Sequence, residues 1–587
     1  MKRIPYGVSN YKKIIVDDSL YIDKTHFIKL LENKYNFLSF LRPRRFGKSL
    51  FISTLQYYYD EYYADIWENL FKDTYIGKNP TKLKSSYRIL FMEFAGISTQ
   101  NMDSIYKGFT FSVKTNLKSY LRKYKYNEQV IETLNNIDDP ENLIKEFFEI
   151  TKNDKIYILI DEYDNFANSL LGESIDNFKK ILGKGGFVRS FYEVIKAATQ
   201  TGVVDRMFVT GVTQITMDSM TSGFNIIRDI TKDEDFNELV GFNTEETKLV
   251  LNNIFTQCKN IDKEWLLNKV VKLYNGYKFS IKAKERVFNS TMVMFFVSEF
   301  DIKRCEFPRE LLDFNVASDY RKIMQLFEIG DTEDNYKVLN ELIENNQTTA
   351  NLKSKIEFDK GFFRDDFVTL LYSMGFVTIK DEILGDTIFT IPNYTIKTLY
   401  FDYFQIEIEN RNQMKFDIRG IRSAITEMAL NNNLQGFQKE LKSVINLLSN
   451  RDYMKFEEKH LKVIALTVLN IAKFYYIKSE AEYNNKYPDI MLLKQEPFNV
   501  KFQFLFELKW VKKGIIHPAK SKQLDSAPLH ISVKQKEGNK SWENKKEEGI
   551  NQIKGYLQLP DIKKLKNLRS YLIVSDGDEL DIIEVEK

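Results

Sequence analysis

Short apolar runs alternate with helix-length amphipathic segments between about residues 35 and 215. Polar residues or glycine bound each run, as expected for strands that are buried on both faces of a sheet. The runs are Phe37–Leu41, Arg88–Phe94, Ile156–Ile160 and Met207–Thr210. Because helical sequence separates each run from the next, the pattern predicts a parallel sheet with helices on both faces.

The hydrophobic pattern changes after residue 232. Residues from about 235 to 405 have helical periodicity, interrupted by two short runs that predict a small hairpin, Phe376–Ile379 and Thr387–Ile391. Residues 418–478 are predicted to be helical. Strand patterns return at Ile490–Leu493, Phe502–Trp510 and Tyr571–Val574, with a helix before the last. We therefore predict an α/β multidomain protein with parts 1–232, 233–410 and 411–587, of which the middle is a helical lid region.

The composition is that of an ordinary folded protein. The chain has 587 residues, 43% of them hydrophobic and 28% charged, with a net charge of +3. These values exclude a mostly disordered chain and a globally basic nucleic-acid coat. The two cysteines, Cys258 and Cys305, cannot supply a disulfide framework or a cysteine-based zinc site. No signal peptide or run of about 18 apolar residues is visible, so we expect a cytoplasmic protein without a membrane span.

A candidate phosphate loop follows the first predicted strand. Residues 40–49 read FLRPRRFGKS and lead into an amphipathic segment. Gly47, Lys48 and Ser49 match the end of a P-loop, in which the lysine contacts the β- and γ-phosphates and the hydroxyl binds Mg²⁺. The first glycine of that motif falls on Arg42 instead. The alternative is a surface turn that enters a helix.

Two further strand ends support the nucleotide interpretation. The run Ile156–Ile160 is followed by Asp161 and Glu162, as needed to hold Mg²⁺ and to orient a water molecule. The run Met207–Thr210 leads to Thr213, a polar residue suited to contact the γ-phosphate. The order of these elements predicts a P-loop ATPase that uses ATP and Mg²⁺, with Ser49 and Asp161 at the metal.

Acidic residues with a lysine mark a second candidate site near the end of the chain. Asp489 precedes one predicted strand, and Glu507 and Lys509 share one face of the next, 18 residues later (507 − 489). Two carboxylates that hold Mg²⁺ beside a lysine are suited to cleave a phosphodiester. We assign Asp489 and Glu507 to the metal and Lys509 to the nucleophile or the developing charge. The alternative is a nuclease fold without activity.

Lysines are frequent in residues 511–549, between these strands and the next helix. Two interpretations are open: a solvated mobile loop, or a flexible electrostatic contact to a nucleic-acid backbone.

Several ordered motifs resemble the AAA-ATPase-like family of bacterial proteins, which commonly carry a C-terminal PD-(D/E)xK nuclease domain. They are YIDKT at 21–25, RPRRFGKSL at 42–50, LIDEYD at 159–164, TGVT at 210–213, LVGFN at 239–243, YNGYKF at 274–279 and IPN at 391–393. The resemblance implies that the missing first glycine is a family trait. We place Arg44, Arg45 and Phe46 in the phosphate site, where the two arginines supply forked donors to phosphate oxygens. The alternative is that the arginines face solvent or an adjoining domain.

The same resemblance extends to the nuclease part. It implies an acid near Glu480, for which we choose Glu482, and an accessory helix that carries Gln552 and Tyr556 one turn apart. We predict an ATP-binding protein that controls Mg²⁺-dependent cleavage or binding of nucleic acid, with a homo-oligomer as one option. The alternative is a nucleotide-dependent interaction protein whose nuclease-like part is an inert docking module.

Overall fold

The computed structural model describes residues 2–94, 96–98, 100–165, 181, 186–213, 226–314, 316–318, 325–356, 361–452, 457–479, 488–512 and 529–586. The chain forms two compact units. The first contains Met1–Val338 and Gln347–Ile396, and the second contains Leu339–Asn346 and Lys397–Lys587. Among the described helices, none combines the length and the apolar character needed to cross a membrane.

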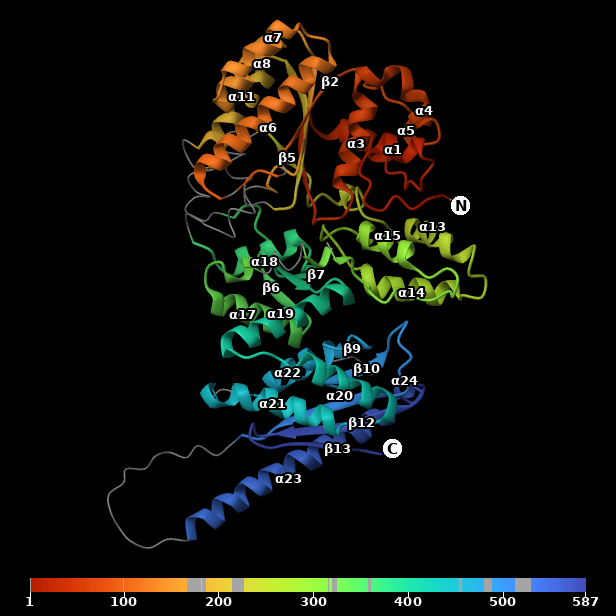
Figure 1. Ribbon diagram of the computed structural model, residues 1–587, viewed down its shortest axis with the longest axis vertical. Coiled ribbons are helices and arrows are strands. Elements are labelled where there is room, and N and C mark those ends of the chain that lie inside the picture. The colour runs from red at the N-terminus through yellow and green to blue at the C-terminus, as the bar shows by residue number, and fades with distance from the viewer. Residues whose placement is uncertain are drawn as a thin grey trace, which may run out of the picture. The chain divides into compact units, whose positions relative to one another are not determined.

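The first unit is built on a five-stranded sheet in the order β2-β3-β4-β1-β5, and every pairing is parallel. Its strands are β1 (Phe37–Leu41), β2 (Arg88–Glu93), β3 (Ile156–Asp161), β4 (Val204–Gly211) and β5 (Arg228–Asp229). In Figure 1, α6, α7, α8 and α11 lie on one side of the strands and α1, α3, α4 and α5 lie on the other. The predicted parallel sheet between two helical layers is therefore confirmed.

The helices of these two layers have the following bounds. One layer contains α6 (Met102–Lys123), α7 (Glu128–Thr133), α8 (Pro140–Ile150) and α11 (Phe187–Gln200). The other contains α1 (Tyr11–Val16), α3 (Lys48–Tyr59), α4 (Trp67–Phe71) and α5 (Tyr75–Lys78), with α2 (His26–Lys34) before β1.

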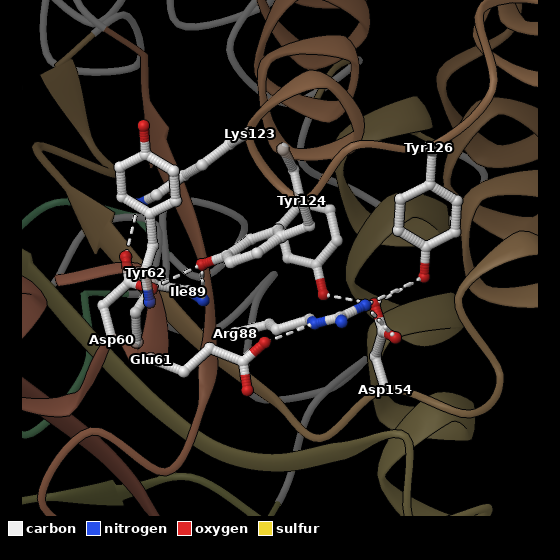
Figure 2. Close-up of polar contacts among 10 residues, drawn as sticks. Asp60, Glu61, Tyr62, Arg88, Ile89, Lys123, Tyr124, Tyr126 and Asp154 are labelled. Carbon is white, nitrogen blue, oxygen red and sulfur yellow. Dashed lines mark hydrogen bonds and ion pairs between the residues drawn. The ribbon is translucent and has the colours of Figure 1, made fainter. Parts of the chain in front are cut away.

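A buried polar network closes the end of the sheet opposite the strand carboxyl ends (Figure 2). Asp60, which follows α3, is fully buried; it accepts a hydrogen bond from the Tyr124 hydroxyl at 2.8 Å and pairs with Lys123. Arg88, the first residue of β2, pairs with Asp154 at 2.7 Å. These contacts join the ends of α3 and α6 to one end of the sheet. The candidate site residues lie at the other end, where the carboxyl ends of the strands meet.

The rest of the first unit is mostly helical, as predicted. It contains α13 (Thr244–Phe255), α14 (Lys263–Tyr274), α15 (Ser290–Glu299) and α18 (Arg364–Met374), while α17 (Thr332–Glu344) and α19 (Tyr394–Asn412) are divided between the two units. The predicted hairpin is confirmed as β7 (Thr378–Ile383) and β8 (Asp386–Thr390). A third strand, β6 (Thr348–Ala350), pairs with β8 and was not predicted.

Cys258 and Cys305 form a disulfide with a Cα–Cα distance of 5.7 Å. Cys258 lies just after α13, and Cys305 lies in the turn after α15, so the bond joins the distal ends of two packed helices. Sequence analysis excluded a disulfide framework and did not foresee this single cross-link. The cytoplasmic location therefore stays a prediction.

The second unit contains a mixed five-stranded sheet in the order β13-β12-β11-β10-β9. Its strands are β9 (Tyr475–Ser479), β10 (Ile490–Lys494), β11 (Gln503–Trp510), β12 (Leu568–Ser575) and β13 (Leu580–Glu584). Its helices are α20 (Ile418–Asn431), α21 (Gln435–Asp452), α22 (Glu458–Asn470), α23 (Leu529–Leu557) and α24 (Pro560–Lys563). The helical prediction for 418–478 is wrong at its end, because the chain turns after Asn470 and residues 475–479 pair with β10.

Helices cover both faces of this sheet (Figure 1). On one face, Ile553 and Leu557 of α23 pack against Met491, Leu505 and Leu572. On the other face, Phe437 of α21 lies 6.0 Å from Phe506, centroid to centroid. Glu507 and Lys509 share the strand face of Leu505, so they emerge beside α23.

Helix α23 approaches the sheet closely at Gly549. A Cβ atom at this position would lie 2.3 Å from Cδ1 of Leu572, so a larger residue would require the Leu572 side chain to shift. Residues 529–549 of the lysine-rich stretch are helical, which contradicts the loop interpretation for them. Of its lysines, Lys545 and Lys546 pair with glutamates of the same helix.

Candidate functional sites

Arg42 stands where an ordinary P-loop has its first glycine, and its side chain anchors the loop to the protein interior. Its side chain is buried, and its guanidinium donates to the carbonyls of Leu41, Thr231 and Phe236 at 2.7–2.9 Å. The same group lies over the rings of Phe40 and Phe279, at 4.3 and 4.1 Å from their centroids. Arg42 therefore replaces a flexible glycine by a rigid anchor.

Lys48 begins α3 and is directed into the loop. Its ammonium donates to the carbonyls of Arg42 and Pro43 at 2.9 and 3.0 Å. Burial lowers the pKa of Lys48, while nearby Asp161 and Glu162 oppose the shift. Gly47 and Arg45 have φ of +99° and +70°, a left-handed conformation that turns the loop. The lysine and the loop thus have the local arrangement of a phosphate site.

The acids after β3 divide into two roles. Asp161 accepts from the Thr210 hydroxyl at 2.7 Å, across the sheet from β4. Glu162 has a φ of +49° and accepts from the Asn165 amide at 3.0 Å. Its pKa is raised, first by burial, and Lys48 partly offsets that shift. A carboxylate held this way beside the loop is suited to accept a proton or orient water.

Thr213 and Asp164 bind each other. Asp164 accepts hydrogen bonds from the backbone N–H of Val212 and from both the N–H and the hydroxyl of Thr213, at 2.6–3.1 Å. Both residues are buried. The Thr213 hydroxyl is directed to Asp164, and Thr213 is not among the described residues that line the adjoining cavity. Its assignment to the γ-phosphate stays a prediction.

A cavity of about 770 Å³ adjoins the phosphate loop. Its volume lies within the range of roughly 300–1,000 Å³ that is typical of ligand pockets. Its lining includes Arg44–Phe51 with Glu162, and therefore the predicted residues Arg44, Arg45, Phe46, Gly47, Lys48 and Ser49. Pro5–Ser9, Leu20–Ile22 and Leu239–Phe242 also line it. The cavity wall therefore combines cationic and apolar side chains.

Asp23 and Lys24 of the YIDKT motif have structural roles. Asp23 accepts from Thr25 and from the N–H of Tyr75, and Lys24 pairs with Glu246 at 2.7 Å. Because Glu246 also completes the capping box of α13, this pair joins the segment between α1 and α2 to the start of α13.

The second predicted site is assembled where β10 and β11 pair. The antiparallel register sets Ile490 against Phe506, so Asp489 stands opposite Glu507. Asp489 accepts the backbone N–H of Leu508 at 2.8 Å, and Lys509 pairs with Glu507 at 2.8 Å. Glu507 and Lys509 are both buried. The three residues chosen from the sequence are thus brought together.

One carboxylate oxygen of Glu507 is buried without a hydrogen-bond partner. Burial and the neighbouring Asp489 raise the pKa of Glu507, and Lys509 opposes them. A buried, unsatisfied carboxylate oxygen is costly unless a cation or a proton satisfies it. The residues present therefore fit a divalent cation held by Asp489 and Glu507.

Comparison with known proteins now adds two family matches. Residues 5–221 match the family described as predicted AAA-ATPase, and residues 456–585 match the PD-(D/E)XK nuclease superfamily. The chain combines an AAA-ATPase-like segment with a nuclease-superfamily segment. The resemblance drawn from the motifs is confirmed for both.

One curated relative is an "Uncharacterized protein in vnfD 5'region" of Azotobacter chroococcum mcd 1. It is 26% identical over 309 residues, which cover 51% of this chain and 53% of the relative. The chain thus spans about half the length of this relative.

The nuclease-superfamily segment contains two site residues that sequence analysis missed, both on α22. Glu458 lies with Oε1 3.8 Å from the Lys509 ammonium and Oε2 3.3 Å from the Trp510 N–H. Lys462, one turn later, lies 3.8 Å from Asp489. A polar pair four residues apart at the start of an apolar helix is the signal in the sequence.

The remaining predicted residues are placed differently from one another. Tyr556 of α23 is buried, and its pKa is raised by burial, then by the charges of Glu507 and Asp489 and by a side-chain hydrogen bond with Glu507. Gln552 is exposed, and no contact joins it to the acids among the described residues. Glu482 and Glu480 lie outside the described residues. In the described part of the chain, no group of three or more His, Cys, Asp or Glu side chains is arranged as a metal site.

Proposed function

We propose that this protein binds ATP in the cavity of the AAA-ATPase-like segment and cleaves nucleic acid at the acids of the nuclease-superfamily segment. The observation that carries the second part is the pairing of Asp489 with Glu507 beside Lys509, with one buried oxygen of Glu507 unsatisfied. The first part is supported by the placement of Lys48 and Ser49 in the wall of a nucleotide-sized cavity.

At the ATP site, the triphosphate lies against Arg44, Arg45 and Lys48, and the base lies against apolar side chains of the same cavity wall. Lys48 exchanges its bonds to the Arg42 and Pro43 carbonyls for phosphate oxygens, which gain more from an ammonium than neutral carbonyls do. Arg44 and Arg45 add forked donors at the cavity wall. Ser49 and Asp161 would hold Mg²⁺ when it is bound, and Glu162 would orient the attacking water.

At the nuclease site, Asp489 and Glu507 would hold Mg²⁺. When bound, the cation lowers the pKa of a coordinated water and polarises the phosphodiester. Lys509 stabilises the charge that develops as water attacks phosphorus and the bond to the leaving oxygen breaks. The N–H of Leu508 keeps Asp489 in place.

The test is cleavage of a panel of linear single- and double-stranded DNA and RNA by the full chain, with Mg²⁺ or with EDTA. We expect cleavage in Mg²⁺, none in EDTA, and none by Asp489→Asn or Lys509→Met. If the wild-type protein binds these nucleic acids but cuts none, the inert docking module replaces the nuclease.

We further propose that ATP controls the nuclease. ATP must then bind one conformation of the chain more tightly, with a coupling free energy of about 1–3 kcal/mol. A non-hydrolysable ATP analogue is expected to change cleavage or nucleic-acid affinity several-fold, and Lys48→Ala is expected to remove the change. Reciprocally, nucleic acid shifts ATP affinity by the same factor. Equal cleavage with and without the analogue would contradict this control.

A further inference from the structure

Four lysines are buried in the described part of the chain: Lys24, Lys48, Lys462 and Lys509. Lys24 pairs with Glu246, Lys48 belongs to the phosphate loop, and Lys509 belongs to the acid–lysine motif. The fourth, Lys462, belongs to no motif, yet it is only 5% exposed. Burial of an ammonium costs several kcal/mol unless it is compensated, so its position calls for a reason.

Lys462 lies on the face of α22 that is directed at the nuclease acids. It follows Glu458 by four residues, so the two side chains occupy neighbouring turns of one face. Its ammonium is 3.8 Å from Oδ1 of Asp489, while Oδ2 of the same carboxylate accepts the Leu508 N–H at 2.8 Å. Asp489 is therefore held from two sides, by β11 and by α22.

The other ammonium groups near this carboxylate are engaged with other acids. Lys509 pairs with Glu507 and lies near Glu458, and Lys545, whose charge also acts on Glu458, pairs with Glu548. Among the described residues, Lys462 is the ammonium within ion-pair distance of Asp489. Without a divalent cation, the Lys462 ammonium compensates the charge of Asp489. When a divalent cation is bound, the ammonium and the cation both act on the Asp489 carboxylate.

We propose that Lys462 is a positioning residue that compensates and orients Asp489 in the cation-free protein and competes with the divalent cation for it. This inference rests on the proposed metal site. Lys462 stabilises the fold when the site has no cation, and it weakens cation affinity, so that the site is filled only at sufficient cation concentration.

The experiment compares Lys462→Met with wild type, with Lys462→Arg, which keeps the charge, and with Lys473→Met. The last variant breaks a more exposed ion pair, with Asp402, in the same unit and away from the acids. Mn²⁺ binding is measured by electron paramagnetic resonance, and thermal unfolding is followed in EDTA and along a Mn²⁺ titration. These readouts do not depend on cleavage.

In EDTA we expect Lys462→Met to unfold at a lower temperature than wild type, because Asp489 loses its compensation. We expect its Mn²⁺ affinity to rise at least tenfold, so that Mn²⁺ stabilises it more than wild type. Lys462→Arg is expected to resemble wild type in both measurements. Lys473→Met is expected to keep wild-type Mn²⁺ affinity.

Unchanged or weaker Mn²⁺ affinity in Lys462→Met overturns the inference and leaves Lys462 a structural residue, while the proposed metal site stands. If Lys462→Met does not fold, Lys462→Gln is titrated instead under the same criterion. If wild type and all Lys462 variants bind no Mn²⁺, the proposed metal site fails and the inference fails with it.

Discussion

Asp489 accepts a hydrogen bond from the backbone N–H of Leu508, the residue between Glu507 and Lys509. The 2.8 Å contact links the end of one strand to the centre of the next, across the antiparallel pair. It requires an acceptor at position 489 but no charge, whereas cation binding requires the charge. Structure and chemistry at this residue can therefore be separated by substitution.

We predict that Asp489→Asn abolishes cleavage and costs less stability than Asp489→Ala, because both variants lose the ion pair with Lys462 but the amide oxygen still accepts the Leu508 N–H. Asp489→Ala removes the acceptor and is expected to cost about 1.5–3 kcal/mol. Urea unfolding in EDTA and a cleavage assay measure both. If the two variants were equally stable, the hydrogen bond would contribute nothing.

For Glu507→Gln we predict higher stability than wild type, with a gain that depends on pH. The pKa of Glu507 is raised in the fold, so the folded state favours the protonated acid, and wild-type stability falls as pH rises from the ordinary carboxyl pKa toward the folded one. The glutamine has no such dependence. In EDTA, the stability gain of Glu507→Gln over wild type should grow as the pH rises from 4.5 to 8. The control variant Glu579→Gln, which removes an exposed ion pair, should show no such growth.

The nuclease acids could be chosen from the sequence because strand alternation and antiparallel pairing are local rules. Asp489 and Glu507 needed only two short strands, and both formed where the pattern placed them. Glu458 and Lys462 were missed because helical periodicity gives their shared face but not the strand that it meets. The meeting of α22 with β11 is a tertiary packing choice.

A similar limit applies to the phosphate loop. The order of strand, loop, helix and acidic strand end predicted its place in the sheet, and the structure confirms that fold. The sequence could not show that Arg42 is directed away from the cavity, toward three carbonyls of the unit. Those carbonyls come from residues about 190 positions away, as well as from its neighbour.

We predict that Lys48→Ala weakens ATP binding at least tenfold, about 1.4 kcal/mol, since it removes the ammonium of the cavity wall that we propose contacts the phosphates. Glu162→Gln is expected to keep ATP affinity and to slow turnover. Equilibrium binding of a fluorescent ATP analogue and phosphate release measure the two effects. Unchanged ATP affinity in folded Lys48→Ala would contradict the phosphate-loop assignment. Unchanged turnover in Glu162→Gln would show that Glu162 takes no part in the reaction.

Arg42→Gly would restore the glycine of an ordinary P-loop, yet we predict that it damages this protein. It leaves buried carbonyls of Leu41, Thr231 and Phe236 without their donor and opens the space between Phe40 and Phe279. We expect a loss of stability above about 2 kcal/mol and weaker ATP binding. Arg42→Lys keeps the charge but cannot reproduce the forked donors of the guanidinium. Its stability and ATP affinity should therefore lie between those of wild type and those of Arg42→Gly. A stable Arg42→Gly that binds ATP more tightly would contradict the anchor role.

The last prediction concerns the bond between Cys258 and Cys305, the two cysteines of the chain. It closes a loop with a sequence separation of 47 residues, for which chain entropy gives a stabilisation of about 4 kcal/mol, at the upper end of the usual 2–4. The loop contains α14 and α15, and the first turns of α15 line the cavity through Ser290 and Met294. Reduction should therefore lower stability and also weaken ATP binding.

Urea unfolding and ATP titration of wild type with and without a phosphine reductant measure these two effects, and mass spectrometry counts free thiols in each sample. The Cys258→Ser, Cys305→Ser double variant should behave as reduced wild type under both conditions, because it has no bond to lose. If oxidised and reduced wild type, confirmed by their thiol counts, unfold at the same urea concentration, the cross-link does not stabilise the lid. If only ATP affinity is unchanged, the bond stabilises the distal ends of α13 and α15 without reaching the cavity wall.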